Sequence, residues 1–129
     1  IGGHDTRFRA LVTHASVYDM GAFHGVTDFP SWWELMMQGA PWSDSDYDRY
    51  SPHRFVRDWK TPTLVLHGER DYRVPIGEGL ALFEALQAHG VWSELAIFPD
   101  ENHWVLKPRN AIAWYETTLD FLDRVWAAT

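Results

Sequence analysis

The sequence predicts an α/β domain whose parallel sheet is flanked by helices. Short apolar runs end at a Gly or a Pro, a polar loop comes next, and apolar residues at helical spacing follow. This order of strand, loop and helix is the repeating unit of a parallel sheet covered by helices. The chain has 129 residues, 46% of them hydrophobic and 22% charged, which is enough for one compact domain and too few for two.

The first half of the chain contains one predicted strand and a long irregular segment. Residues 10–15 (ALVTHA) are apolar and partly β-branched, which favours a buried strand. Residues 18–59 contain several Pro and Gly, together with an acidic run at 43–48 that we interpret as a solvated loop. Within this segment, residues 30–37 begin with Pro and favour about two helical turns. We interpret residues 18–59 as a lid or cap.

The second half of the chain predicts two strands that alternate with two helices. Residues 63–68 (TLVLHG) are an apolar run closed by a Gly, and this is the clearest strand in the sequence. The second strand covers residues 95–98 and ends at Pro99. Between them, a helix is predicted over 76–89 and ends before Gly90; its apolar positions are Ile76, Leu80, Phe83 and Leu86.

The last predicted element is a helix over residues 109–127. Apolar residues recur along it at helical spacing, and we expect them to form the buried stripe of the helix. The stripe consists of Ile112, Tyr115, Leu119, Leu122 and Trp126.

Composition excludes several classes of partner. The formal net charge is -7, and Lys60 and Lys107 are the only lysines, so nucleic acids and anionic membranes are not expected partners. No apolar run approaches the roughly 18 residues of a spanning helix. The absence of Cys excludes disulfides and thiolate chemistry. We expect no cofactor and no metal site, because the spacing of His24 and Asp28 is too common to indicate one.

The beginning of the sequence predicts a piece of a longer polypeptide. It starts at Ile1-Gly2-Gly3 without an initiator Met and without the basic and apolar regions of a signal peptide. The cellular compartment, whether cytoplasmic, periplasmic or secreted, stays open.

Two ionisable residues follow the two clearest strands. Asp71 lies in the loop after residues 63–68, and His103 lies in the loop after residues 95–98. Reactive groups of open parallel sheets gather in the loops at the carboxyl ends of the strands, so these two side chains would be neighbours if the strands are adjacent. A carboxylate that holds the Nδ1 hydrogen of an imidazole leaves Nε2 free to face a nucleophile.

Simpler interpretations of these residues stay open at this point. Asp71 could cap the following helix or pair with Arg73, and the rival acids are Glu69, Asp100 and Glu101. The last two lie too near His103 in sequence to hold its ring from across a loop. We interpret the other six histidines as structural: His4, His14, His24, His53, His67 and His89.

A nucleophile is missing from the sequence. In α/β hydrolases the triad runs in the order nucleophile, acid, histidine, and the serine sits in a G-x-S-x-G turn. Asp71 and His103 fit that order, but none of the six serines lies in such a turn. Either the hydrolase interpretation is wrong, or the serine lies upstream of this chain.

Two loops resemble those of the prolyl oligopeptidase family of serine peptidases. Residues 67–75 (HGERDYRVP) look like the acid loop of the family, and residues 100–108 (DENHWVLKP) look like its histidine loop. Residues 50–62 and 3–10 are also similar to segments of its members. The resemblance runs from about residue 3 to residue 126 and is closest to dipeptidyl-peptidase V and acylaminoacyl-peptidase-like enzymes.

The resemblance implies that residues 1–129 are the carboxyl-terminal half of an α/β-hydrolase parallel sheet. Asp71 would then be the catalytic acid and His103 the catalytic base, while the nucleophilic Ser and any β-propeller would lie on the upstream side. The chain alone would be inactive, because the imidazole would have no hydroxyl to deprotonate.

Three functions follow from these expectations. The leading one is a serine peptidase that acts on peptides and releases dipeptides or acylated amino acids from the amino terminus. The alternatives are an esterase or lipase with the same triad, and a non-catalytic fragment that packs against a partner. The partners expected are a peptide substrate and the upstream segment of the same enzyme, and a homo-oligomer stays open. A set of aromatic and Met side chains could line the substrate pocket or fill the contact with the upstream segment. These residues are Trp32, Trp33, Met36, Met37 and Trp42.

Overall fold

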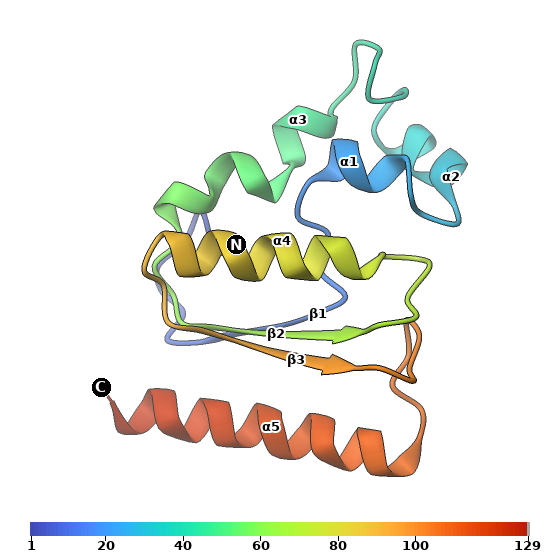
Figure 1. Ribbon diagram of the computed structural model, residues 1–129. Helices are drawn as coiled ribbons and strands as arrows, with labels where there is room; N and C mark the ends of the chain where they lie inside the picture. Colours follow the sequence, from blue (N-terminus) through green and yellow to red (C-terminus); the bar gives the residue numbers. More distant parts are fainter. Residues whose placement is uncertain (129) are drawn as a thin grey trace.

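The structure, a computed structural model, describes residues 1–128 as a three-stranded parallel sheet between two long helices (Figure 1). The strand order is β1-β2-β3. The strands are β1 (Leu11–His14), β2 (Thr63–Gly68) and β3 (Ser93–Phe98). Helix α4 (Ile76–Ala88) lies on one face of the sheet, and helix α5 (Pro108–Ala127) lies on the other. The predicted α/β class with a parallel sheet flanked by helices is confirmed.

Strand β2 is the centre of the molecule, because all six of its residues are buried. Its side chains alternate between the two faces of the sheet. Val65 packs with Leu82 and Leu86 of α4, whereas Leu64 and Leu66 belong to a second cluster with Phe121 of α5. Burial of each such side chain stabilises the fold by about 1.5–3 kcal/mol. An apolar run without polar alternation therefore predicts this strand correctly, since both of its faces are covered.

Four short helical segments form the region between β1 and β2. They are α1 (Met20–His24), α2 (Pro30–Met36), α3 (Tyr47–Tyr50) and the 3-10 helix η1 (Pro52–Asp58). In Figure 1 they lie on the side of α4 that faces away from the sheet. The short helix predicted at residues 30–37 is confirmed. The other three segments were not predicted, because four to seven residues carry too little periodicity to be read.

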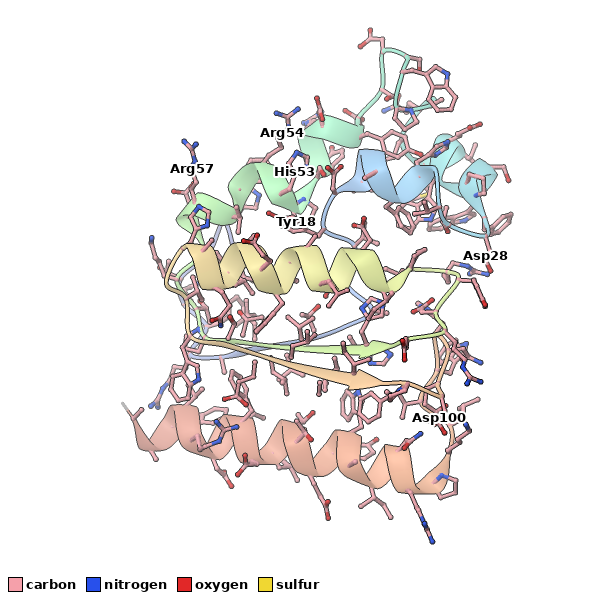
Figure 2. All side chains as sticks on the ribbon, viewed as in Figure 1. Tyr18, Asp28, His53, Arg54, Arg57 and Asp100 are labelled. Carbon is pink, nitrogen blue, oxygen red and sulfur yellow. The ribbon has the colours of Figure 1, made fainter. Side chains whose placement is uncertain are left out.

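A buried carboxylate anchors this region to α4. Glu78, in the first turn of α4, accepts the backbone N–H groups of Tyr18 at 2.7 Å and of Asp19 at 2.8 Å. The backbone carbonyl of Tyr18 in turn accepts the backbone N–H of His53 of η1. The side chains of Tyr18 and His53 are labelled over α4 in Figure 2. Burial raises the pKa of Glu78, although the two N–H bonds oppose the shift. The chain is therefore fixed to α4 shortly after β1 and just before α1 begins.

The buried face of α5 differs from the predicted stripe. Phe121 and Val125 are fully buried against the sheet, and Trp114 and Leu122 pack beside them. Four residues of the predicted stripe are exposed instead: Ile112, Tyr115, Leu119 and Trp126. The prediction was wrong because α5 carries two apolar stripes at helical spacing, and spacing alone does not say which one meets the sheet. No helix within residues 1–128 has the length and apolar character that crossing a membrane requires.

The side chain of His67, in β2, packs very closely against α4. Its imidazole is fully buried, and Nε2 donates a hydrogen bond of 2.7 Å to the carbonyl of Val74. Nδ1 has no hydrogen-bond partner within the described residues and faces Gly79 of α4, where a Cβ atom would lie 2.4 Å from Nδ1. Burial is the main cause that lowers the pKa of His67 below its ordinary value of 6.5. His67 is therefore a neutral imidazole at neutral pH.

We predict that Gly79→Ala destabilises the protein by about 1–3 kcal/mol, because the added methyl group must displace a tightly packed ring. Gly77 is the matched control, since a Cβ there would meet nothing within 4 Å. Gly77→Ala should leave stability unchanged or raise it by up to about 1 kcal/mol. Urea denaturation of both variants tests the prediction, and equal stabilities would contradict the packing described for His67.

We predict that the free energy of unfolding falls as the pH drops below 6.5, the ordinary pKa of His67. The folded state binds this proton more weakly than the unfolded chain, so its stabilisation is complete above that pH and is lost below it. The variant His67→Gln keeps an N–H donor for Val74 and has no proton to gain. Urea denaturation between pH 5 and pH 7.5 should show a smaller pH dependence in His67→Gln than in the wild type. Equal slopes would show that His67 does not resist protonation.

Candidate active site

Asp71 and His103 meet where β2 and β3 end. The two strands pair in parallel with Gly68 opposite Phe98, so the loops that follow them leave the same edge of the sheet. His103 Nδ1 donates a hydrogen bond of 2.8 Å to Asp71 Oδ2, across 32 residues of sequence. A carboxylate can only accept, so Nδ1 carries the proton and Nε2 is left for another group. The sequence therefore predicted correctly that these two side chains are neighbours.

The carboxylate of Asp71 is held by its own loop. Oδ1 accepts the backbone N–H of Arg73 at 2.9 Å and that of Val74 at 2.8 Å, and the residue is only 3% exposed. Two N–H donors on one oxygen leave Oδ2 directed at His103. The simpler interpretations are not observed, because α4 begins after Pro75 without a side-chain cap and the guanidinium of Arg73 pairs with Asp28.

A glycine lets the two loops touch. A Cβ atom on Gly68 would lie 2.1 Å from the carbonyl oxygen of Asn102 and 2.8 Å from that of Glu101. The N–H of Arg70 also donates to the carbonyl of Glu101 at 2.9 Å. Only a residue without a side chain permits this approach, so Gly68 sets the distance between the acid loop and the histidine loop.

Two of the rival acids, Glu101 and Asp100, have other partners. Glu101 is buried and accepts the N–H groups of Leu106 and Lys107 and the amide of Asn110. Burial opposes ionisation of Glu101, but these hydrogen bonds together hold its pKa below the ordinary value. Asp100 pairs with Lys107 and is labelled at this edge of the sheet in Figure 2. Glu101 therefore closes the histidine loop onto α5, a role that its position in the sequence did not indicate.

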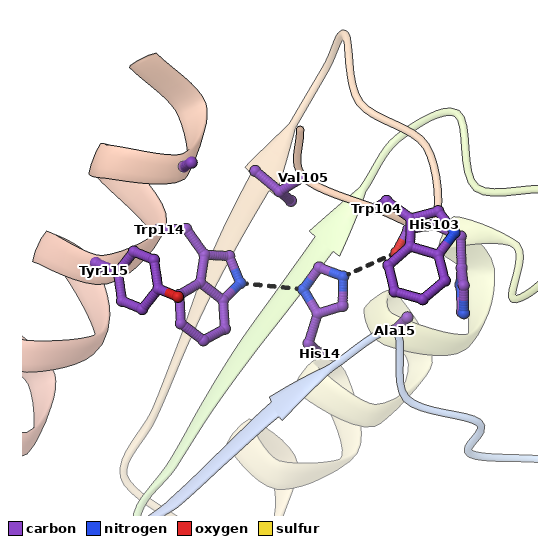
Figure 3. Close-up of a pocket in the computed structure, with 8 residues that line it drawn as sticks. His14, Ala15, His103, Trp104, Val105, Trp114 and Tyr115 are labelled. Atoms are coloured by element: carbon purple, nitrogen blue, oxygen red, sulfur yellow. Dashed lines mark hydrogen bonds between the residues drawn. The ribbon is translucent and has the colours of Figure 1, made fainter. Parts of the chain in front are cut away.

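A cavity lies beside His103. It measures about 370 Å³ and lies between the carboxyl end of β1, the histidine loop and the first turns of α5 (Figure 3). Most of the side chains around it are aromatic or apolar. The lining residues are His14, Ala15, His103, Trp104, Val105, Ala111, Trp114 and Tyr115. The imidazole of His103 is about one-third exposed, at 34%. A reacting group could therefore reach it from outside the described residues.

His14 also contacts the histidine loop, which sequence spacing did not predict. Its Nε2 lies 3.2 Å from the carbonyl oxygen of His103, 89 residues away in the sequence. His14 ends β1 in the same parallel sheet, so it lies at the edge where Asp71 and His103 meet. No motif marks His14, so the sequence indicated only a structural role for it. Of the other histidines predicted to be structural, His24 contacts the Tyr47 hydroxyl at 2.7 Å.

No serine within residues 1–128 forms a hydrogen bond to His103. Ser51 contacts His53, Ser16 contacts Thr13, and Ser93 contacts Gln87. The group predicted at residues 32–42 does not line this cavity, and three of its members, Trp32, Met36 and Trp42, are exposed. The structure thus contains an acid and a base in hydrogen-bond contact, with no serine of the described residues bonded to the base.

Comparisons with known proteins match all or nearly all of the chain. Residues 1–129 match the prolyl oligopeptidase family. Dipeptidyl-peptidase 5 of Porphyromonas endodontalis is 42% identical over an alignment of 131 residues. The alignment covers 95% of this chain and 18% of the relative. Dipeptidyl-peptidase 5 of Schizosaccharomyces pombe is 40% identical over 122 residues, which cover 90% of this chain and 17% of the relative.

Solved structures share the fold. The acylaminoacyl peptidase of Pyrococcus horikoshii superimposes with a TM-score of 0.88 at 23% identity, over 96% of this chain and 21% of that protein. A puromycin-hydrolyzing peptidase of Mycobacterium tuberculosis gives a TM-score of 0.89 at 21% identity, over 96% of this chain and 19% of that protein. The chain spans about a fifth of the length of the relatives that it matches. As its two loops predict, the chain belongs to the prolyl oligopeptidase family.

Proposed function

We propose that this chain supplies the acid and the base of a serine peptidase. The observation that carries the proposal is the 2.8 Å bond between His103 Nδ1 and Asp71 Oδ2, with Asp71 buried and His103 accessible. A buried carboxylate holds the imidazole in one tautomer and stabilises the imidazolium that forms when Nε2 takes a proton. Because the chain belongs to a peptidase family, we expect a peptide as the substrate.

The proposal places the nucleophilic serine outside these 129 residues, on their amino-terminal side. Residues 1–129 are then the carboxyl-terminal portion of a catalytic domain, and the nucleophile segment and any β-propeller belong to the rest of the enzyme. Three observations support this: Asp71 precedes His103 as in the hydrolase order, β1 is an edge strand of the sheet, and the relatives are about five times longer. A further parallel strand beside β1 would end next to the cavity at His14 and Ala15.

The chemistry follows from this arrangement. The serine hydroxyl attacks the peptide carbonyl while His103 Nε2 takes its proton, and Asp71 remains ionised throughout. His103 then gives the proton to the leaving amine. The amine departs, and an acyl-enzyme remains. Water hydrolyses the acyl-enzyme with His103 as the base again. The relatives named dipeptidyl-peptidase 5 and acylaminoacyl peptidase favour cleavage near the amino terminus of a peptide, with release of a dipeptide or an acylated amino acid.

We predict that Asp71→Asn in the complete enzyme lowers kcat by a factor on the order of 10⁴, because the amide stabilises the wrong tautomer of His103. Asp100→Asn is the matched control, since Asp100 pairs with Lys107 and does not contact His103. It should keep nearly full activity. Hydrolysis of chromogenic dipeptidyl and acylaminoacyl substrates measures both variants. Full activity of Asp71→Asn would reject the assignment of the acid.

We predict that a fluorophosphonate labels one serine of the complete enzyme, and that this serine lies outside residues 1–129. The reagent reacts with a serine only when a base activates the hydroxyl, so His103→Ala should abolish labelling. Peptide mapping by mass spectrometry locates the labelled residue. A label on one of the six serines of this sequence would contradict the proposal, as would labelling that survives His103→Ala.

A further inference from the structure

We propose that His14 is a positioning residue for His103, and that Trp114 fixes the tautomer in which His14 acts. The inference rests on the proposed function, because it concerns the base of that reaction. It joins three elements that are far apart in the sequence: the end of β1, the histidine loop and α5. Figure 3 shows the two hydrogen bonds that meet on the ring of His14.

The contacts determine where the proton of His14 lies. The indole Nε1 of Trp114 is 3.1 Å from His14 Nδ1, and an indole N–H can only donate. Nδ1 must therefore be unprotonated and must accept. On a neutral ring the proton is then on Nε2, which lies 3.2 Å from the carbonyl oxygen of His103, a group that can only accept. Donor and acceptor match at both ends, so the hydrogen bonds run in one direction, from Trp114 through His14 to His103.

This chain of hydrogen bonds completes the support of the base. Asp71 holds the ring of His103 through Nδ1, but a bond to the ring does not fix the main chain that carries it. His14 holds that main chain at its carbonyl. Because His14 is the last residue of β1, it ties the histidine loop to the strand beside which the proposal places the nucleophile. The distance from His103 Nε2 to a serine hydroxyl then depends on His14.

The backbone after His14 supports the same conclusion. Ala15 has φ of 51°, in the left-handed region that a residue with a side chain seldom adopts, and its N–H donates to the carbonyl of Leu66 at 3.0 Å. Such a conformation is strained and persists only where the surroundings hold it. The chain turns away from the sheet directly after His14, and both residues line the cavity beside His103. His14 is thus held at the end of the strand.

Three variants of the complete enzyme test the inference. His14→Phe keeps a ring and removes both hydrogen bonds, and His14→Gln keeps one acceptor and one N–H donor. Trp114→Phe removes the indole donor and leaves His14 in place. Trp92→Phe is the control, because the indole N–H of Trp92 contacts Glu94 at the other end of β3. Steady-state kinetics with a peptide substrate and NMR of ¹⁵N-labelled histidines are the two measurements.

For His14→Phe we expect a fall in kcat on the order of tenfold with KM unchanged, because a misplaced base weakens the transition state and not substrate binding. His14→Gln should recover most of the loss, Trp114→Phe should lose less than His14→Phe, and Trp92→Phe should match the wild type. In the NMR spectra, His14 should be protonated at Nε2 and bare at Nδ1. The Nδ1 proton of His103 should exchange faster with water in His14→Phe.

Each measurement can overturn the inference. A wild-type kcat in His14→Phe would do so, and equal losses in His14→Phe and His14→Gln would assign His14 to packing alone. An Nδ1–H tautomer of His14 would contradict the direction of the hydrogen bonds. If the wild-type enzyme hydrolysed no peptide, the proposed function would fail, whereas the NMR comparison would still decide whether His14 holds His103.

Discussion

The hydrogen bond between Asp71 Oδ2 and His103 Nδ1 depends on how closely two loops can approach. The parallel pairing of β2 and β3 brings both loops to one edge of the sheet, and Gly68 lets the backbone of one rest on the backbone of the other. A side chain at Gly68 would separate the carboxylate from the imidazole. The backbone N–H groups of the acid loop then occupy Oδ1 of Asp71, which leaves Oδ2 for the ring. Backbone packing therefore sets the geometry of the acid–base pair.

The groups around this pair leave the carboxylate of Asp71 to His103. His67 lies 3.8 Å from Asp71 Oδ2, and as an imidazolium it would compete with His103 for that carboxylate. Burial against Gly79 keeps His67 neutral, so the negative charge of Asp71 acts mainly on His103. Glu101, although close in sequence, is occupied by N–H donors of the loop and of α5. Asp71 is thus the carboxylate that faces the base, whereas Glu101 holds the histidine loop in place.

Sequence patterns predicted the parts of the molecule that local chemistry determines. The apolar run of β2 is readable because both faces are buried, and Asp71 and His103 are readable because each follows a strand in a parallel sheet. The buried face of α5 was not predicted correctly. The helix has two apolar stripes, and tertiary packing determines which one is buried. The contact of His14 with His103 joins residues 89 positions apart, and no spacing rule links them. Asp71 and His103 also pair over a long distance in sequence, but each lies in a recognisable loop, whereas no motif marks His14.

The central claim is that His103 Nε2 acts on a hydroxyl that comes from outside these 129 residues. An experimental structure of the complete enzyme tests this most directly, through the distance between Nε2 and the nearest serine Oγ. The account predicts an upstream serine within hydrogen-bond reach, roughly 2.6–3.2 Å, beside the cavity at the end of β1. An Nε2 atom that faces solvent or a non-nucleophilic group in that structure would contradict it.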